Sequence, residues 1–323
     1  MENAKKKRSS LLGLALFLSI LIGFVGCKKA LDGEGSSPNF DEGEVVFDES
    51  SANALRIDKS GNNTAYPLIK LGNENLSEFK SVDSSFGYYY LAVGELDAPA
   101  VWGGSLKSTC IEIEGDKAYI GYHIPGATYG GAIDVVDVSD PEDPQLLQTV
   151  LFADMDILSI KIDGLKIYAA GARDTEVLTH LSSAAAIAVT NLSLGGTLLH
   201  PIQYAEVPGN VATSVDHTAA LIYATTGNND GGVVMVNKSN LQLVAQIDQE
   251  NAKGLTFDPW ALGFYVLHTD GADDSYANAN VDFYPLGVPN AAFGFSFPNA
   301  IQHEAGANIV FNPFNALLLI ANG

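Results

Sequence analysis

Three histidines in this chain follow or precede strand-like apolar segments, where their imidazoles could bind a metal ion or transfer protons. His123 and His268 each come directly after such a segment, and His303 lies shortly before another. Imidazole nitrogens combined with carboxylates form ligand sets for zinc or iron. None of the three has the close sequence spacing of a metal-binding motif, so a metal site would depend on the fold to bring them together.

Other polar residues occupy similar positions after apolar segments. Residues 228–230 and 270–274 are short acidic stretches whose oxygens suit calcium, although neither has the spacing of an EF-hand loop. We therefore predict no cofactor and keep calcium as an open alternative. The residues expected to share one ligand-binding face are His123, Arg173, Asp174, Asp230, His268, Asp270 and His303.

Nucleophilic catalysis finds little support in the sequence. The chain has no G-x-S-x-G elbow, and the glycine pair Gly130–Gly131 precedes no helix that could hold a phosphate. Cys110 lies in an alternating segment typical of a strand, which predicts a buried, inert thiol. We expect a binding or scaffold module. An enzyme, either a hydrolase or a metal-dependent oxidoreductase, remains the alternative.

A repeated hairpin would position these residues. Each copy has an apolar strand, a tight turn built on Asp, Asn, Gly or Pro, and a second apolar strand. The copies recur at intervals of roughly 40–55 residues, which is the size of a propeller repeat. They cover residues 111–121, 160–171, 214–224, 255–266 and 309–323.

Two more strands follow most hairpins. Third strands are expected at residues 132–138, 185–189 and 232–236, and fourth strands at residues 145–150, 198–204 and 241–247. Four short antiparallel strands per repeat are typical of β-propeller blades. The fold class predicted is therefore an all-β propeller with about four blades and a partial fifth. Its second-to-third loops and inter-blade linkers should share one face, where a ligand would bind.

Two segments of the first copy carry a resemblance to a known family. Residues 115–120 have a tyrosine-bearing strand, and residues 135–144 read V-V-D-V-S-D-P-E-D-P. Together they resemble the LVIVD-repeat β-propeller lipoproteins, whose repeat ends in an I-D-V-S-D-P-x-x-P strand and turn. The resemblance covers residues 108–323, with degenerate later copies. It implies a propeller fold and an exported protein, and it implies no particular activity.

The repeat reaches Gly323 inside the second strand of the fifth copy, so the ring is expected to be incomplete. Either the chain is part of a longer product, which we favour, or residues 45–107 complete the ring. That N-terminal segment is β-rich, but no repeat can be assigned to it. The propeller repeats are placed at residues 108–323.

The N-terminus has the layout of an export signal. Basic residues precede an apolar stretch, and residues 24–27 read F-V-G-C, which resembles the lipobox of bacterial lipoproteins. This predicts a signal peptide at residues 1–26, lipidation of Cys27, and a flexible tether at residues 27–44. Lys28 gives no inner-membrane retention cue, so an outer-membrane location is expected.

The charge balance limits the partners. The formal net charge is −21, with 38 Asp and Glu against 17 Lys and Arg. Such an acidic surface repels nucleic acid and anionic lipid headgroups. The expected contacts are a membrane through the lipid anchor and a protein or glycan ligand.

Overall fold

The computed structural model describes most of the chain after residue 103 and short pieces before it. All described residues belong to one compact unit, Leu31–Gly323. A helix long and apolar enough to cross a membrane is not found among them. The predicted signal peptide and Cys27 lie outside the described residues, as does the predicted tether except for its last residue, Glu44. The structure describes residues 44–49, 56–58, 65–67, 89–91, 95–101, 104–126, 128–227, 231–258, 260, 262–269, 276–288, 290–302, 307–312 and 317–322.

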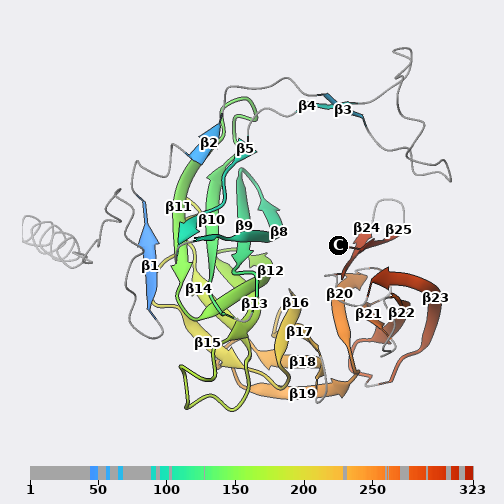
Figure 1. The fold of residues 1–323 in the computed structure, drawn as a ribbon. Helices are drawn as coiled ribbons and strands as arrows, with labels where there is room; N and C mark the ends of the chain where they lie inside the picture. The colour runs from blue at the N-terminus through green and yellow to red at the C-terminus, as the bar shows by residue number, and fades with distance from the viewer. Residues whose placement is uncertain are drawn as a thin grey trace, which may run out of the picture. The chain divides into compact units, whose positions relative to one another are not determined.

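Antiparallel strands in sequence order build the body of the protein (Figure 1). The first sheet contains β8 (Lys107–Glu114), β9 (Lys117–His123), β10 (Gly131–Asp137) and β11 (Gln145–Phe152). The second contains β12 (Met155–Asp163), β13 (Lys166–Arg173), β14 (Ala185–Asn191) and β15 (Gln203–Glu206). The third contains β16 (Val211–His217), β17 (Leu221–Gly227), β18 (Gly232–Asn237) and β19 (Leu243–Asp248).

The fourth and fifth sheets continue this pattern. The fourth sheet contains β20 (Ala252–Asp258), β21 (Gly263–Thr269), β22 (Tyr276–Pro285) and β23 (Phe293–Gln302). The fifth consists, in the described part of the chain, of the hairpin β24 (Ala307–Asn312) and β25 (Leu317–Asn322). The five predicted hairpins are therefore confirmed. The fourth strand of the second sheet begins later than predicted, at residue 203 rather than 198.

Local turn chemistry explains the regular hairpins. Gly115 and Gly164 have φ angles of 58° and 59°, in the left-handed region that favours glycine. Each completes the tight turn between the first two strands of its sheet. These two positions therefore allow the chain to reverse within two residues.

A β-bulge recurs in the first strand of each of the four larger sheets, at Thr109, Leu158, Thr213 and Lys253. At two of these bulges a hydroxyl reaches the neighbouring sheet. Thr109 Oγ1 donates to the Ile157 carbonyl at 2.6 Å, and Thr213 Oγ1 donates to the Ala252 carbonyl at 3.1 Å. These two bulges thus connect the first strands of consecutive sheets.

Consecutive sheets pack face to face through apolar clusters. Tyr119, Val150 and Phe152 of the first sheet pack with Ile167 and Ala188 of the second. Similar clusters join the second sheet to the third and the third to the fourth. Four-stranded antiparallel meanders packed in succession are the blades of a β-propeller. The predicted fold class is confirmed.

The sequence analysis assigned no repeat to residues 45–107. Part of this N-terminal segment joins the first sheet. Strand β1 (Val45–Asp48) pairs antiparallel with β11, so the first sheet has five strands. The remaining described pieces form three short two-stranded pairs. These are β2 (Ile57–Asp58) with β5 (Glu95–Leu96), β3 (Ala65–Pro67) with β4 (Tyr89–Leu91), and β6 (Ala100–Val101) with β7 (Gly104–Ser105).

Candidate binding face

The meander order determines which loops share an end of the sheets. The second strand of each sheet ends, and the next sheet's first strand begins, on the side away from the tight hairpin turns. We call this side the loop end. In the first and second sheets it carries residues 124–130 and 174–184, and the linker to the third sheet is residues 207–210. Residues predicted to bind a ligand were placed at this end.

His123 and His268 both lie close to the loop end, but in different sheets. His123 is partly buried at the end of β9. Burial lowers the pKa of its imidazole, and the positive charge of the nearby Lys107 lowers it further. His268 Nε2 lies 3.1 Å from Asp282 Oδ2 within the fourth sheet. Within the described residues, no three His, Cys, Asp or Glu side chains are close enough to hold a metal ion.

Arg173 is buried at the end of β13. Its guanidinium donates from Nη2 to Asp154 Oδ2 at 2.6 Å and from Nε to the same oxygen at 3.2 Å. The guanidinium carbon also lies 3.9 Å from the centre of the Tyr204 ring. Arg173 therefore holds the end of the second sheet to the linker before it. Its predicted contact with a ligand stays a prediction.

Asp174 organises the longest loop at this end. Its Oδ1 accepts hydrogen bonds from the backbone N–H groups of Glu176 at 2.8 Å and Val177 at 3.1 Å. Such a carboxylate turn is a common use of Asp in loops. The other predicted members of the face, Asp230, Asp270 and His303, lie outside the described residues, as do both candidate calcium stretches.

The sequence analysis missed Asp156, which lies next to these loops. Its Oδ1 accepts a hydrogen bond from the Gly130 N–H at 3.1 Å, so it holds the first loop against β12. Burial raises the pKa of this carboxyl to about 6. Burial also raises the pKa of Tyr129, and the charges of Asp156, Asp174 and Glu176 add to this effect. The loops of the first and second sheets therefore meet in one acidic area.

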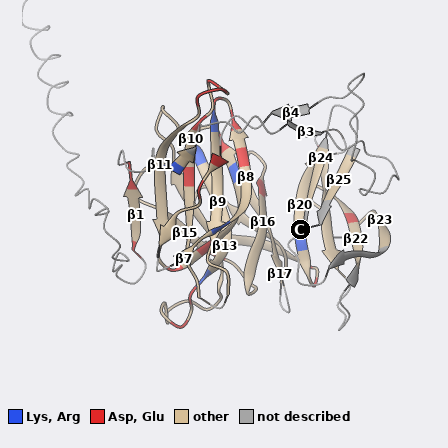
Figure 2. Ribbon diagram, turned by 45° about the horizontal axis from the view of Figure 1, so that its top comes forward, with Lys and Arg blue, Asp and Glu red and all other residues tan. Residues whose placement is uncertain are grey.

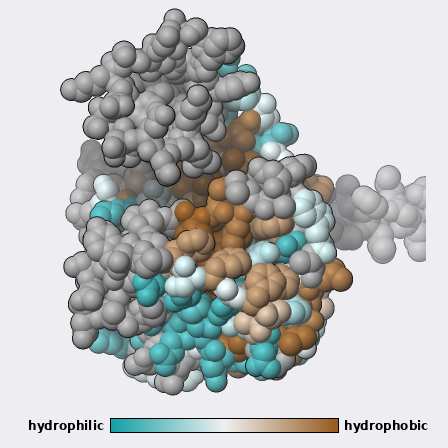
Figure 3. All heavy atoms as spheres, turned by 90° about the vertical axis from the view of Figure 1, so that its right-hand side faces the viewer, coloured by the Kyte–Doolittle hydropathy of each residue, from teal (hydrophilic) through white to brown (hydrophobic). Residues whose placement is uncertain are grey.

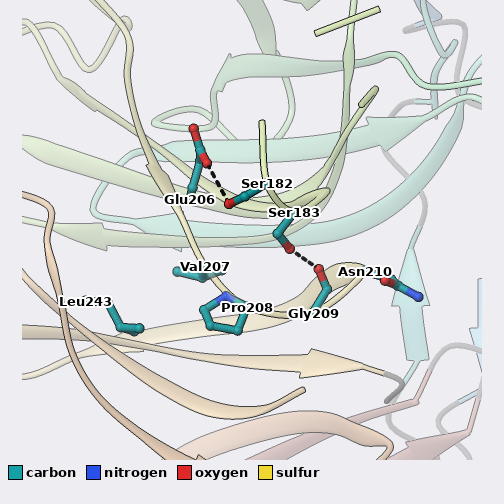
Figure 4. A pocket seen from close by; sticks show the side chains of 8 residues that line it. All are labelled: Ser182, Ser183, Glu206, Val207, Pro208, Gly209, Asn210 and Leu243. Carbon is teal, nitrogen blue, oxygen red and sulfur yellow. Dashed lines mark hydrogen bonds between the residues drawn. The ribbon is translucent and has the colours of Figure 1, made fainter. Parts of the chain in front are cut away.

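A groove of about 490 Å³ opens between the second and third sheets (Figure 4). Ser182 and Ser183 contribute from the long loop, and Leu243 contributes from β19. Glu206 contributes from the end of β15, and the rest of the lining comes from the linker between the sheets. Figure 4 labels the eight lining residues as Ser182, Ser183, Glu206, Val207, Pro208, Gly209, Asn210 and Leu243.

Backbone pairing between loop and linker shapes the groove. The Val207 N–H donates to the Ala185 carbonyl at 3.1 Å, and the Ala185 N–H donates to the Gly209 carbonyl at 3.2 Å. Gly209 has a φ of 112°, and a Cβ there would lie 2.9 Å from Thr226 Cβ. A side chain at this position would therefore be strained in its backbone and crowded by the third sheet.

The groove offers polar and apolar groups side by side. Ser182 Oγ lies 3.4 Å from Glu206 Oε2, and Leu243 is 44% exposed. None of the eight lining residues is a histidine, lysine or arginine. The serine therefore has no imidazole base within the lining, and the set suits hydrogen bonding to a neutral ligand better than nucleophilic catalysis.

No sequence signal distinguishes the groove. Serine, glutamate and proline are ordinary surface residues, and only the packing of two sheets brings them next to Leu243. Acidic residues are spread over several sheets rather than gathered on one (Figure 2). Cys110 was predicted to be buried and is only partly buried, but desolvation still raises the pKa of its thiol to about 11 and leaves it protonated at neutral pH.

Comparisons with known proteins identify no family. No protein-family model matches the chain, and no curated protein matches it. Among solved structures, the WD40 β-propeller domain of Doa1 is similar at 11% identity and a TM-score of 0.39, covering 67% of this chain and 75% of that one. A putative 6-phosphogluconolactonase from Bacteroides fragilis is 15% identical with a TM-score of 0.39, covering 65% and 75%.

A third similar structure is a protein of unknown function from Bacteroides thetaiotaomicron. It is 8% identical with a TM-score of 0.33, and the match covers 67% of each chain. These likenesses are too distant to indicate an activity for this chain. The predicted membership of the LVIVD-repeat family stays a prediction.

Proposed function

We propose that this chain is a membrane-anchored lipoprotein whose propeller binds a protein or glycan at the cell envelope. The groove between the second and third sheets is the observation that carries the binding role. Its hydroxyls and carboxylate can bond sugar hydroxyls or peptide groups, while Leu243 and Pro208 offer apolar contact. The lining has no cationic side chain, which favours a neutral ligand over an anionic one.

The loops at the loop end support the same proposal. The loops after β9 and β13 span residues 124–130 and 174–184. Loops on a rigid scaffold are the usual place for binding residues. The acyl chains on Cys27 would hold this surface near the membrane, with residues 27–44 as the tether.

Binding is tested by pull-down from detergent-solubilised membranes together with a glycan array. The full chain is compared with a Glu206→Gln, Ser182→Ala variant. We expect the variant to lose the retained protein or glycan, since Ser182 loses its hydroxyl and Glu206 loses its charge and one of its two acceptor oxygens. Glu176→Gln is the matched control, because this exposed carboxylate lies in the same loop but outside the groove. Retention by neither full chain nor variant would contradict the proposal.

Anchoring is tested separately by Cys27→Ser. We expect the unchanged chain to incorporate labelled palmitate and to sediment with membranes, and the variant to do neither. Lack of label in the unchanged chain would contradict lipidation, and membrane sedimentation of the unlabelled variant would contradict anchoring through the lipid; both would leave the groove proposal untouched.

A further inference from the structure

The groove between the second and third sheets has two chemically different sides. Figure 4 shows Leu243 and Pro208 on one side and Glu206 beside Ser182 on the other. Leu243 is 44% exposed, and its neighbour on β19, Val244, is 56% exposed. A ligand in this groove therefore meets an apolar surface and a carboxylate at the same time.

The carboxylate of Glu206 has acceptor capacity to spare. Ser182 Oγ donates to it at 3.4 Å, which is a long hydrogen bond, whereas a carboxylate has about four acceptor sites. The lining holds no lysine, arginine or histidine. The lack of a cation disfavours an anionic ligand, and the carboxylate goes further by favouring a ligand that brings a positive charge.

The lining also lacks every aromatic side chain. Aromatic rings give the flat apolar faces on which sugar rings stack, and cages of aromatic rings bind quaternary ammonium ions. A groove with aliphatic and polar residues alone is therefore poorly suited to a glycan or to a choline-like ligand. A protein segment with aliphatic and basic side chains matches it better.

An extended peptide fits the arrangement of the two sides. Successive side chains of an extended chain point in opposite directions, so two adjacent residues can face the two sides of the groove. The exposed Asn210 adds an amide that can both donate to and accept from peptide groups. The volume of about 490 Å³ is that of a site for a short segment.

We infer that the groove binds an extended segment of a partner protein in which an apolar residue is adjacent to an arginine or lysine. The apolar side chain packs on Leu243 and Pro208, and the basic side chain pairs with Glu206. Arginine is the better partner, because its guanidinium can donate two hydrogen bonds to one carboxylate. This inference rests on the proposed function and names the ligand of the same groove.

The chain itself is a poor source of the occupant. Taken together, the predicted tether at residues 27–44 and the internal segments outside the described residues contain more Asp and Glu than Lys and Arg. The basic residues 5–8 belong to the predicted signal peptide. A second copy has the same net charge of −21 and is repelled. The charge of the groove therefore points to a different protein.

The test applies a random dodecapeptide library displayed on phage, and in parallel a glycan array, to the detergent-purified full chain. We expect the selected peptides to share an apolar residue next to arginine or lysine. Glu206→Lys should change that basic position to Asp or Glu. Glu176→Lys is the matched control, because it alters the net charge equally at an exposed residue outside the groove, and it should select the same peptides as the unchanged chain.

Fluorescence anisotropy with the best selected peptide separates the two halves of the site. Replacing its apolar residue by serine should weaken binding by about tenfold or more, because burial of a large aliphatic side chain is lost. Replacing its basic residue by glutamine should weaken binding by about fivefold or less, because Glu206 is exposed to solvent. The second loss should be absent in Glu206→Lys and present in Glu176→Lys.

Apolar peptides have a second place to bind, which the charge reversal separates from the groove. Phe293, Phe295 and Phe297 of β23 are 50%, 43% and 43% exposed. Figure 3 shows hydrophobic residues gathered on that side of the molecule. Binding there does not respond to residue 206. Selection of the same peptides by the unchanged chain and by Glu206→Lys would therefore overturn the inference.

Two further results would overturn it and bear differently on the proposed function. Retention of a glycan with no peptide selected, lost in the Glu206→Gln, Ser182→Ala variant, would make the ligand a glycan and leave the proposed function standing. Selection of neither a peptide nor a glycan would overturn the inference, and failure of the membrane pull-down as well would contradict the proposed function.

Discussion

The first and fourth sheets have the same strand order and similar apolar outer strands, yet they differ in what covers them. Phe152 of the first sheet is 1% exposed, whereas Phe297 at the equivalent position of the fourth is 43% exposed. Strand β1 also pairs with the outer edge of the first sheet. Burial of an outer strand is therefore decided by the segments that pack on it, and not by its own sequence.

The largest effect is expected where the N-terminal segment covers the first sheet. Asp134 is fully buried, and Arg56 donates to both of its oxygens, from Nη1 at 3.0 Å and from Nη2 at 2.5 Å. Arg56→Ala leaves this carboxylate without its cation. We expect the free energy of unfolding to fall by about 3–5 kcal/mol, measured by urea denaturation.

Removing both charges separates the buried charge from the packing around it. The double variant Arg56→Met, Asp134→Asn should recover most of the lost free energy, because neither variant side chain is charged. A loss below about 1 kcal/mol for Arg56→Ala alone would mean that the N-terminal segment does not protect the first sheet.

A smaller effect is expected at the loop end between the first and second sheets. Burial raises the pKa of Asp156 from its ordinary 3.8 to about 6. A raised carboxyl pKa means that the folded protein favours the protonated form, so stability is present below pH 4 and is lost as the pH rises through 6. Asp156→Asn should change little at pH 4 and should stabilise the protein by about 1–2 kcal/mol at pH 7, after allowance for solvent screening.

Urea denaturation of both proteins at pH 4, 5, 6 and 7 measures this difference directly. A gap between variant and wild type that stays constant over the four pH values would show that Asp156 does not titrate in this window. Glu176→Gln is the matched control, because this carboxylate is exposed in the adjacent loop.

The smallest effect is expected for an ion pair at the same interface. Lys161 Nζ of the second sheet lies 2.8 Å from Glu112 Oε1 of the first, and both side chains are partly exposed. A double-mutant cycle with Lys161→Met and Glu112→Gln should give a coupling below about 1 kcal/mol that decreases with salt. A coupling above about 2 kcal/mol would place this pair among the main sources of sheet packing.

The sequence predicted the hairpins well because their signals are local. Turn residues such as Gly115 and Gly164, flanked by apolar alternation, specify a chain reversal without reference to the rest of the fold. The predicted start of β15 was wrong because residues 192–199 form a turn instead of a strand. The side chain of Gln148 in the first sheet holds this turn by hydrogen bonds to both the N–H and the carbonyl of Leu198. That contact cannot be read from nearby residues.

Long-range packing also explains what was missed at the candidate site. Arg173 and Asp174 were chosen for their position after a strand, and the structure gives them partners within the fold. Asp156 and Glu206 belong to strands and were not chosen. Asp156 contacts the loop after β9, and Glu206 lines the groove beside the linker to the third sheet. Only the arrangement of neighbouring sheets reveals these contacts.

The most direct test of the account compares two equivalent phenylalanines. We predict that Phe152→Ala lowers the free energy of unfolding by about 3–5 kcal/mol, because it leaves a cavity between the first two sheets. Phe297→Ala should change it by less than about 1 kcal/mol, since that ring is uncovered. Equal losses at the two positions would contradict the claim that the fourth sheet presents an open copy of the interface that the first sheet has filled.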